Sequence, residues 1–201
     1  MPESGNIQET KSHKRMNDTE LRKKQILKAA TDLFMENGYQ GVNIDVIAEK
    51  CGIVRGTVLR YFGSKRELYN QVLLTRGNLA SDYLGQICED ESISVNEALD
   101  KLADILIKQF TDTLTYIGDD IRDPEYRQNF DVLRLPIFRE TAKSLEKLLL
   151  RGNQEGVLHI DNPKIRAYST TFAIFGIGEA SETPDNMYAE IKALITALLL
   201  L

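Results

Sequence analysis

Hydrophobic residues recur along most of the chain with the spacing of an α-helix. The first clear stripe consists of Ile26, Ala29, Ala30, Leu33 and Phe34. Because residues three and four apart lie on one side of a helix, this spacing predicts a helix with one buried face. Asn17 followed by Glu20 forms a capping box at its start, and Gly38 is a typical glycine beyond its end.

Two shorter stretches with the same pattern follow. Asn43 is a preferred N-cap residue, and the stripe after it consists of Ile44, Ile47, Ala48 and Cys51. Gly52 marks a turn, and a third helix is predicted from about Arg55 to Phe62. Two short helices joined by a glycine turn predict a helix-turn-helix over about residues 43–62, a motif whose second helix enters the major groove of DNA.

The rest of the chain continues the helical pattern, and no region alternates polar and apolar residues as a strand does. Capping signals and periodicity predict helices that start near residues 64, 94, 125, 164 and 185. We therefore expect an all-α fold, in which a helix-turn-helix domain (residues 17–64) precedes a larger helical domain (residues 65–201). Residues 1–16 are polar and are predicted to form a disordered arm.

Charge is distributed unevenly between these two parts. The 201-residue chain has a net charge of −5, but residues 1–76 contain 13 Lys and Arg against 9 Asp and Glu. The remaining residues contain 12 basic and 21 acidic side chains. A basic end joined to an acidic body fits a protein that presents its amino-terminal part to a polyanion.

Several other classes of function lack support in the sequence. Apolar runs are shorter than the roughly 18 residues of a membrane span, and the start lacks the apolar stretch of a signal peptide, so we expect a cytoplasmic protein with no membrane partner. Two cysteines (Cys51, Cys88) and two histidines (His13, His159) do not have metal-ligand spacing. Without a phosphate-binding glycine loop either, we expect no metal, no cofactor and no catalytic activity. Cys51 is interpreted as a small buried hydrophobe, with a redox-sensing cysteine pair as the alternative.

The third predicted helix has two different sides. Val58 and Phe62 lie four residues apart and are expected to face the core. Arginine binds a guanine edge or a phosphate, hydroxyl groups bind phosphate oxygens, and glycine lets a backbone approach DNA closely. Lys65 lies at the start of the next helix, where the positive end of the helix dipole favours phosphate. The candidate DNA-binding residues are Asn43, Arg55, Gly56, Thr57, Arg60, Tyr61 and Lys65.

One joint pattern consists of Asn37-Gly38-Tyr39, Ile47-Ala48, Gly52, Gly56-Thr57, Tyr61-Phe62 and Ser64-Lys65. Through this pattern residues 25–74 resemble the DNA-binding domain of the TetR family of bacterial one-component repressors. Two positions depart from the family: Val54, where many members have Ser or Thr, and Leu59, where an aromatic residue is common. Valine cannot cap a helix and leucine has no hydroxyl group, so we expect fewer contacts with the DNA backbone.

The resemblance implies that the carboxy-terminal part binds a small molecule and forms a homodimer. The helix over 164–178 is apolar on most sides, and such a helix is expected to be buried all round. The expected dimer interface consists of Phe172, Phe175, Ile191, Leu194, Ile195 and Leu198. Aromatic residues that fit a ligand pocket, and equally a plain core, are Phe110, Tyr116, Phe130, Phe138, Tyr168, Phe172 and Phe175.

Together these observations predict a ligand-responsive repressor that binds a palindromic operator in double-stranded DNA as a homodimer. A small, apolar effector molecule is expected to release it. The alternatives are an activator on the same fold and a small-molecule binding protein whose helix-turn-helix is weakened or vestigial.

Overall fold

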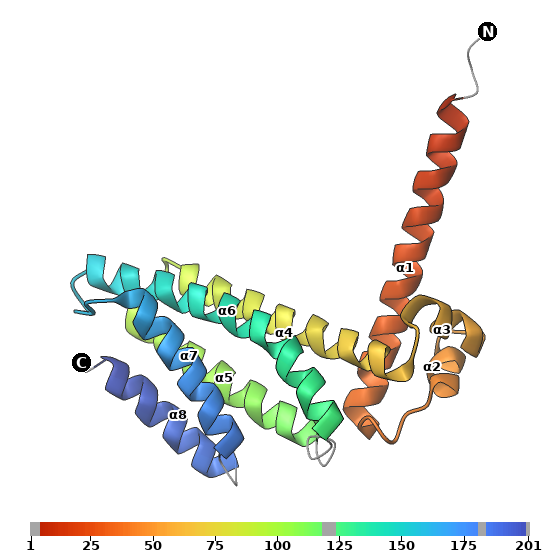
Figure 1. Ribbon diagram of the computed structural model, residues 1–201. Helices are drawn as coiled ribbons and strands as arrows, with labels where there is room; N and C mark the ends of the chain where they lie inside the picture. Colours follow the sequence, from red (N-terminus) through yellow and green to blue (C-terminus); the bar gives the residue numbers. More distant parts are fainter. Residues whose placement is uncertain (1–4, 118–123, 181–183, 200–201) are drawn as a thin grey trace. The chain divides into compact units, whose positions relative to one another are not determined.

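The computed structural model of the protein describes the backbone of residues 5–117, 124–180 and 184–199. Side chains are described over 18–108, 134–174 and parts of the last two helices. All of the described secondary structure is helical (Figure 1), so the predicted all-α fold is confirmed. The helices are α1 (Gly5–Asn37), α2 (Ile44–Lys50), α3 (Arg55–Phe62), α4 (Lys65–Glu89), α5 (Val95–Ile117), α6 (Pro124–Gln154), α7 (Pro163–Ala180) and α8 (Pro184–Leu199).

The chain divides into two compact units, residues 1–73 and 74–201. The division lies inside α4, whereas the sequence predicted a boundary before residue 65. The first turns of α4 belong to the first unit because they pack in its core. Leu68, Tyr69 and Val72 are fully buried, and the Tyr69 ring lies 4.8 Å from the ring of Phe34.

The first helix starts earlier than its capping signal predicted. It begins at Gly5 rather than at Asn17, so the predicted disordered arm is helical from residue 5 onward. Residues 5–16 contain no proline and several good helix formers (Gln, Glu, Lys, Arg, Met). A capping residue inside such a stretch does not stop a helix that can propagate through it.

The first unit is built on the apolar faces of α1, α2 and α3. Its buried side chains include Ile26, Ala30, Phe34, Ile47 and Val58. Asn43 caps α2, because its side-chain Oδ1 accepts a hydrogen bond from Val46 N at 3.0 Å. Gly38, Gly52 and Gly63 follow the three helices with φ values of 69°, 63° and 77°, the left-handed region that glycine adopts without strain. The predicted ends of these helices are therefore confirmed.

The second unit has one core, to which the end of α4 and the helices α5–α8 contribute. Ser94 caps α5 as predicted, since its Oγ accepts a hydrogen bond from Glu97 N at 3.2 Å. Deeply buried members of the core are Leu84, Cys88, Leu102, Leu148, Leu149, Ala167, Ile174 and Ile191.

Within the single chain, helix α7 is buried on one side only. The burial of its other side, which the resemblance assigns to a second subunit, stays a prediction. Ala167 and Ile174 are buried, whereas Ile165 is 66% exposed and Phe172 is 40% exposed. The apolar residues of α7 thus divide between the core of the unit and its surface.

Two residues of the predicted dimer interface, both on α8, are buried within their own chain. Ile191 and Ile195 are buried in the core of their own chain, with 0% and 5% exposure, so they have no surface to offer a partner. Leu194 is partly buried against the same core. The side chains of Phe175 and Leu198 lie outside the described residues.

Candidate nucleic-acid interface

Helices α2 and α3 are joined by a tight turn at Gly52. Gly52 N donates a hydrogen bond to Glu49 O at 3.0 Å, and Ile53 N donates to Ala48 O at 3.0 Å. These bonds reverse the chain immediately after α2, so that α3 packs back on α2 and buries Val58 completely. Phe62, predicted to brace the same side, is only partly buried.

One face of α3 is open to solvent. Gly56 and Arg60 are exposed on it, Arg55 is exposed at the helix start, and Thr57 and Tyr61 are half-buried. Gly56 and Arg60 lie four residues apart on the side opposite Val58, which explains why they share a face. Apart from the chain neighbours of Gly56 and the backbone of its own helix, no described atom lies within 4 Å of the place where a Cβ of Gly56 would be, so this face is unobstructed at its middle.

The arginines of α3 have different neighbours. Arg60 stacks on the adjacent aromatic ring, with its Cζ 5.2 Å from the centroid of Tyr61. Arg55 forms an ion pair with Asp45 of α2, and its Nη1 lies 2.7 Å from Asp45 Oδ2. The sequence analysis missed this pair because the two residues are ten positions apart on different helices, a separation that no helical spacing rule relates.

The start of α3 lacks a side-chain cap, as the valine at position 54 predicts. Val54 is the N-cap residue, and its side chain, which has no hydrogen-bond acceptor, is 73% exposed. Leu59 is half-buried rather than fully exposed. The consequence of either residue for DNA contacts stays a prediction.

The side chains of Lys65 and Asn43 both contact other residues of the first unit. Ser64 caps α4 by accepting a hydrogen bond from Glu67 N at 3.1 Å, and its hydroxyl donates to the Glu67 carboxylate at 3.0 Å. Lys65 in the first turn holds its Nζ 4.2 Å from the ring centroid of Tyr39. Asn43 is exposed, but its side-chain oxygen is used by the α2 cap, which leaves its amide NH2 group to face a ligand.

The predicted aromatic pocket is only partly within the described side chains. Those of Phe110, Tyr116, Phe130 and Phe175 lie outside them. Phe138 and Phe172 meet edge to face with ring centroids 6.2 Å apart, and Tyr168 is half-buried. The two described rings that meet thus form a packing contact, and the lining of a pocket by these residues stays a prediction.

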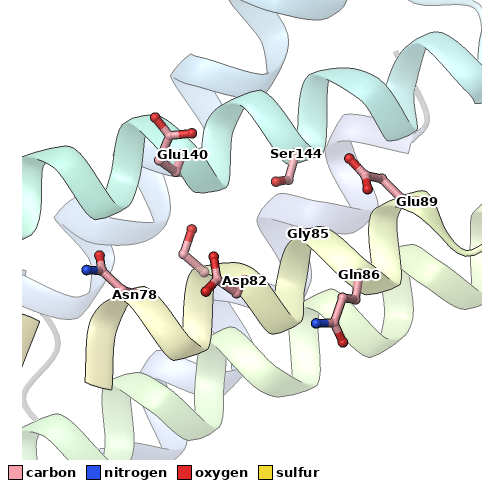
Figure 2. Close-up of a pocket in the computed structure, with 8 residues that line it drawn as sticks. Asn78, Asp82, Gly85, Gln86, Glu89, Glu140 and Ser144 are labelled. Atoms are coloured by element: carbon pink, nitrogen blue, oxygen red, sulfur yellow. The ribbon is translucent and has the colours of Figure 1, made fainter. Parts of the chain in front are cut away.

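A groove of about 440 Å³ lies elsewhere in the second unit, between α4 and α6 (Figure 2). Its lining is polar and consists of Asn78, Ser81, Asp82, Gly85, Gln86, Glu89, Glu140 and Ser144. Two of its carboxylates already bind lysines of α6, since Glu89 lies 2.5 Å from Lys147 and Glu140 lies 2.6 Å from Lys143. This groove differs in chemistry from the apolar pocket that the sequence predicts.

The described residues hold no group of three or more His, Cys, Asp and Glu side chains arranged to bind a metal ion. Of the described helices, none is long and apolar enough to cross a membrane.

A short helix that packs on the preceding helix through a glycine turn and is exposed along one face is the arrangement of the helix-turn-helix, the motif of a class of DNA-binding transcription regulators. Residues 26–72 match the family described as bacterial regulatory proteins, tetR family. The helix-turn-helix domain of the chain thus belongs to this TetR family of transcriptional regulators.

Curated relatives agree with this assignment. YfiR of Bacillus subtilis, an HTH-type transcriptional regulator, is 29% identical over 154 residues, which cover 73% of this chain and 70% of YfiR. The HTH-type transcriptional regulator RutR of Escherichia coli is 42% identical over 60 residues, which cover 30% of this chain and 28% of RutR. The match to YhgD of B. subtilis also spans only 28% of that protein.

Solved structures share the fold over most of the chain. A transcriptional regulator from Cytophaga hutchinsonii has a TM-score of 0.73 at 16% identity and covers 87% of this chain and 95% of its own. SmeT, the repressor of the Stenotrophomonas maltophilia multidrug efflux pump SmeDEF, has a TM-score of 0.58 at 19% identity, with coverage of 89% and 88%. At these identities the likeness concerns the fold alone.

Proposed function

We propose that the protein regulates transcription by placing α3 in the major groove of an operator. The observation that carries this proposal is the open face of α3, where Gly56 and Arg60 are exposed, with Arg55 exposed beside it at the helix start. Arginine supplies bidentate contacts to guanine or to phosphate, and an unobstructed glycine lets the helix approach the bases. The excess of basic residues in the first 76 positions favours the same end of the chain for a polyanion.

We propose that the regulator acts as a homodimer through α7 and α8. Ile165, Phe172 and Tyr188 are apolar residues with exposed fractions of 66%, 40% and 42%. Small residues are exposed on the same two helices, namely Ala173, Gly176, Ala189 and Ala193. Exposed apolar side chains interspersed with small ones suit close helix packing against a second copy. A two-fold dimer would present two recognition helices about 34–36 Å apart to a palindromic operator.

The proposed regulation is release from the operator when a small molecule binds the second unit. A ligand that prefers a state with wrongly spaced recognition helices lowers DNA affinity by its differential affinity for the two states. This scheme makes the protein a repressor, and an activator on the same fold stays the alternative. The proposed effector is a small apolar molecule, as the aromatic residues of the second unit predict. We also propose that the protein resides in the cytoplasm.

Arg60→Ala tests the operator-reading role. Selection from a random duplex pool first identifies the preferred sequence, and affinities are then measured for that sequence and for random DNA. Losing a base contact is expected to weaken binding to the selected sequence by about 1–3 kcal/mol, with a smaller loss on random DNA. Arg139→Ala, an exposed arginine of the second unit, is the matched control and should bind both duplexes like wild type.

Two results would contradict the proposal. One is a selection that enriches no sequence. The other is an Arg60→Ala variant whose affinity equals that of wild type on every duplex. Either result would favour the alternative function, a small-molecule binding protein with a vestigial helix-turn-helix, for which the exposed Val54 at the head of α3 is the supporting feature.

A further inference from the structure

Helix α3 begins in an electrostatically unusual way. Its first residue is Arg55, a cation at the end of the helix where the dipole is already positive. Its N-cap residue, Val54, accepts a hydrogen bond from Thr57 N through its backbone oxygen at 2.9 Å, but its side chain has no oxygen to offer the other open N–H groups of the first turn. Asp45 of α2 supplies the missing negative charge across the turn, with its Oδ2 2.7 Å from Arg55 Nη1.

We infer that Asp45 is a specificity-determining residue, because it holds Arg55 against α2 and restrains it from binding any phosphate that comes near. The inference rests on the proposed function, since it concerns how α3 meets DNA. Asp45 does not itself touch DNA in this scheme and acts through Arg55.

The strength of the pair fits this role. Both side chains are more than half exposed, at 54% for Arg55 and 63% for Asp45. Pairs of this kind contribute about 0.2–1 kcal/mol, so a well-placed partner on the operator can replace Asp45 at small cost. On random DNA, where few contacts are aligned, the same small free energy shifts Arg55 toward Asp45 and away from phosphate.

A second acidic residue of the first unit provides a matched comparison. Asp32 of α1 pairs with Lys50 of α2, at 3.6 Å between Oδ2 and Nζ. Asp32→Asn therefore removes one negative charge, as Asp45→Asn does, and it also frees a basic side chain from its ion pair. That side chain is Lys50 of α2 and not a residue of α3. A general effect of net charge would make Asp32→Asn and Asp45→Asn behave alike.

The test uses the full chain and a random-sequence duplex, with binding measured across about 50–200 mM salt. Wild type is compared with Asp45→Asn, Arg55→Gln, the Asp45→Asn/Arg55→Gln double variant and Asp32→Asn. Asp45→Asn should bind the random duplex more tightly than wild type. The slope of log K against log salt should become steeper by up to about 0.9, the effect of one full added phosphate contact, which amounts to at most about a threefold extra gain at the low-salt end.

In the Arg55→Gln background Asp45→Asn should leave the slope unchanged, and Asp32→Asn should leave it close to that of wild type. Two results would overturn the inference. One is an Asp45→Asn change that steepens the salt slope as much in the Arg55→Gln background as in wild type. The other is an Asp32→Asn variant whose salt slope is as steep as that of Asp45→Asn. Circular dichroism and thermal melting verify that each variant is folded. Absence of DNA binding by the wild type at low salt is a separate outcome, which would overturn the proposed function and this inference with it.

Discussion

The two cysteines have different surroundings, and in both of them burial raises the thiol pKa. Cys88 is 2% exposed in the core of the second unit, and burial raises its pKa to about 12 against the opposing effect of Arg151. Cys51 is half-buried at the end of α2, and burial raises its pKa despite Arg22 and Lys50. The thiolate is the reactive form, so raised pKa values work against the redox-sensing alternative.

Because the pKa of the Cys88 thiol is raised, we expect the folded protein to lose stability at alkaline pH. The ordinary thiol pKa of 9.0 applies to the unfolded chain, and the folded value is about 12, so the folded protein retains a proton that the unfolded chain releases between these values. The contribution is complete below pH 9 and is lost as pH rises toward 12. The slope it adds is at most about 1.4 kcal/mol per pH unit.

Urea unfolding of wild type and Cys88→Ala at about pH 8 and pH 10 measures this effect. Other titrating groups are common to both proteins, so the difference in their pH slopes isolates Cys88. Wild type should lose more stability than the variant over this interval, and parallel slopes would refute the assignment.

Sequence reasoning at the residue scale identified the caps but not the pairs. Asn43 and Ser64 were predicted as N-caps, because a cap and its helix are neighbours in sequence. The contacts of Arg55 with Asp45 and of Lys65 with Tyr39 join residues on different segments. Their positions depend on how α1–α4 pack, which local spacing does not encode.

At the scale of the element, the end of α6 is informative. Two glycines, Gly152 and Gly156, lie near this end, but Gly152 lies inside the helix, which ends at Gln154. Gly156 makes the turn with a φ of 73°, and Leu158 N then donates a hydrogen bond to Gly152 O at 3.0 Å. The chain folds back so closely that Leu158 occupies the space beside Gly152.

Gly152→Ala is therefore expected to destabilise the second unit. A Cβ at this position would lie 2.7 Å from Leu158 Cγ and 3.2 Å from its Cβ, closer than atoms pack without displacement. Overpacking of this kind costs about 1–3 kcal/mol, to be measured by denaturant unfolding.

A double-mutant cycle with Leu158→Ala provides the control. Removing the Leu158 side chain beyond Cβ takes away the atom that lies 2.7 Å from the new methyl group. Gly152→Ala should then cost clearly less than in wild type. Additive effects would mean that the close approach is not the cause.

Some helix boundaries are set by neighbouring residues and can be predicted from the sequence, whereas others depend on contacts between distant parts of the chain. The ends of α2 and α3 agree with the sequence because glycines terminate them locally. The start of α1 does not, since a single cap signal competes with the propensity of the residues before it. The division within α4 depends on Tyr69 packing against Phe34, a contact between distant parts of the chain.

At the scale of the whole molecule, the exposed side of α7 bears on assembly. Phe172→Glu should place a charge in the proposed dimer interface and yield a monomer in sedimentation experiments. Phe172 is 40% exposed, so the chain itself should remain folded. Substitution at Ile191, which is fully buried, would confound assembly with unfolding.

Leu79→Glu is the matched control, because Leu79 is a 64% exposed apolar residue of α4 in the same unit. This variant should sediment like wild type. A Phe172→Glu protein that stays dimeric, or a Leu79→Glu protein that dissociates, would refute the interface proposed on α7 and α8.

The separation of buried and exposed apolar residues on α7 has a consequence for the dose response of the regulator. Ile174 is buried in its own chain, whereas Phe172 is 40% exposed, so in the proposed dimer folding and assembly would be two distinct equilibria. Where a dimer is the species that binds an operator, its concentration follows mass action and rises more steeply than that of the subunit. Occupancy of the operator would then respond sharply to the rate at which the cell makes the protein.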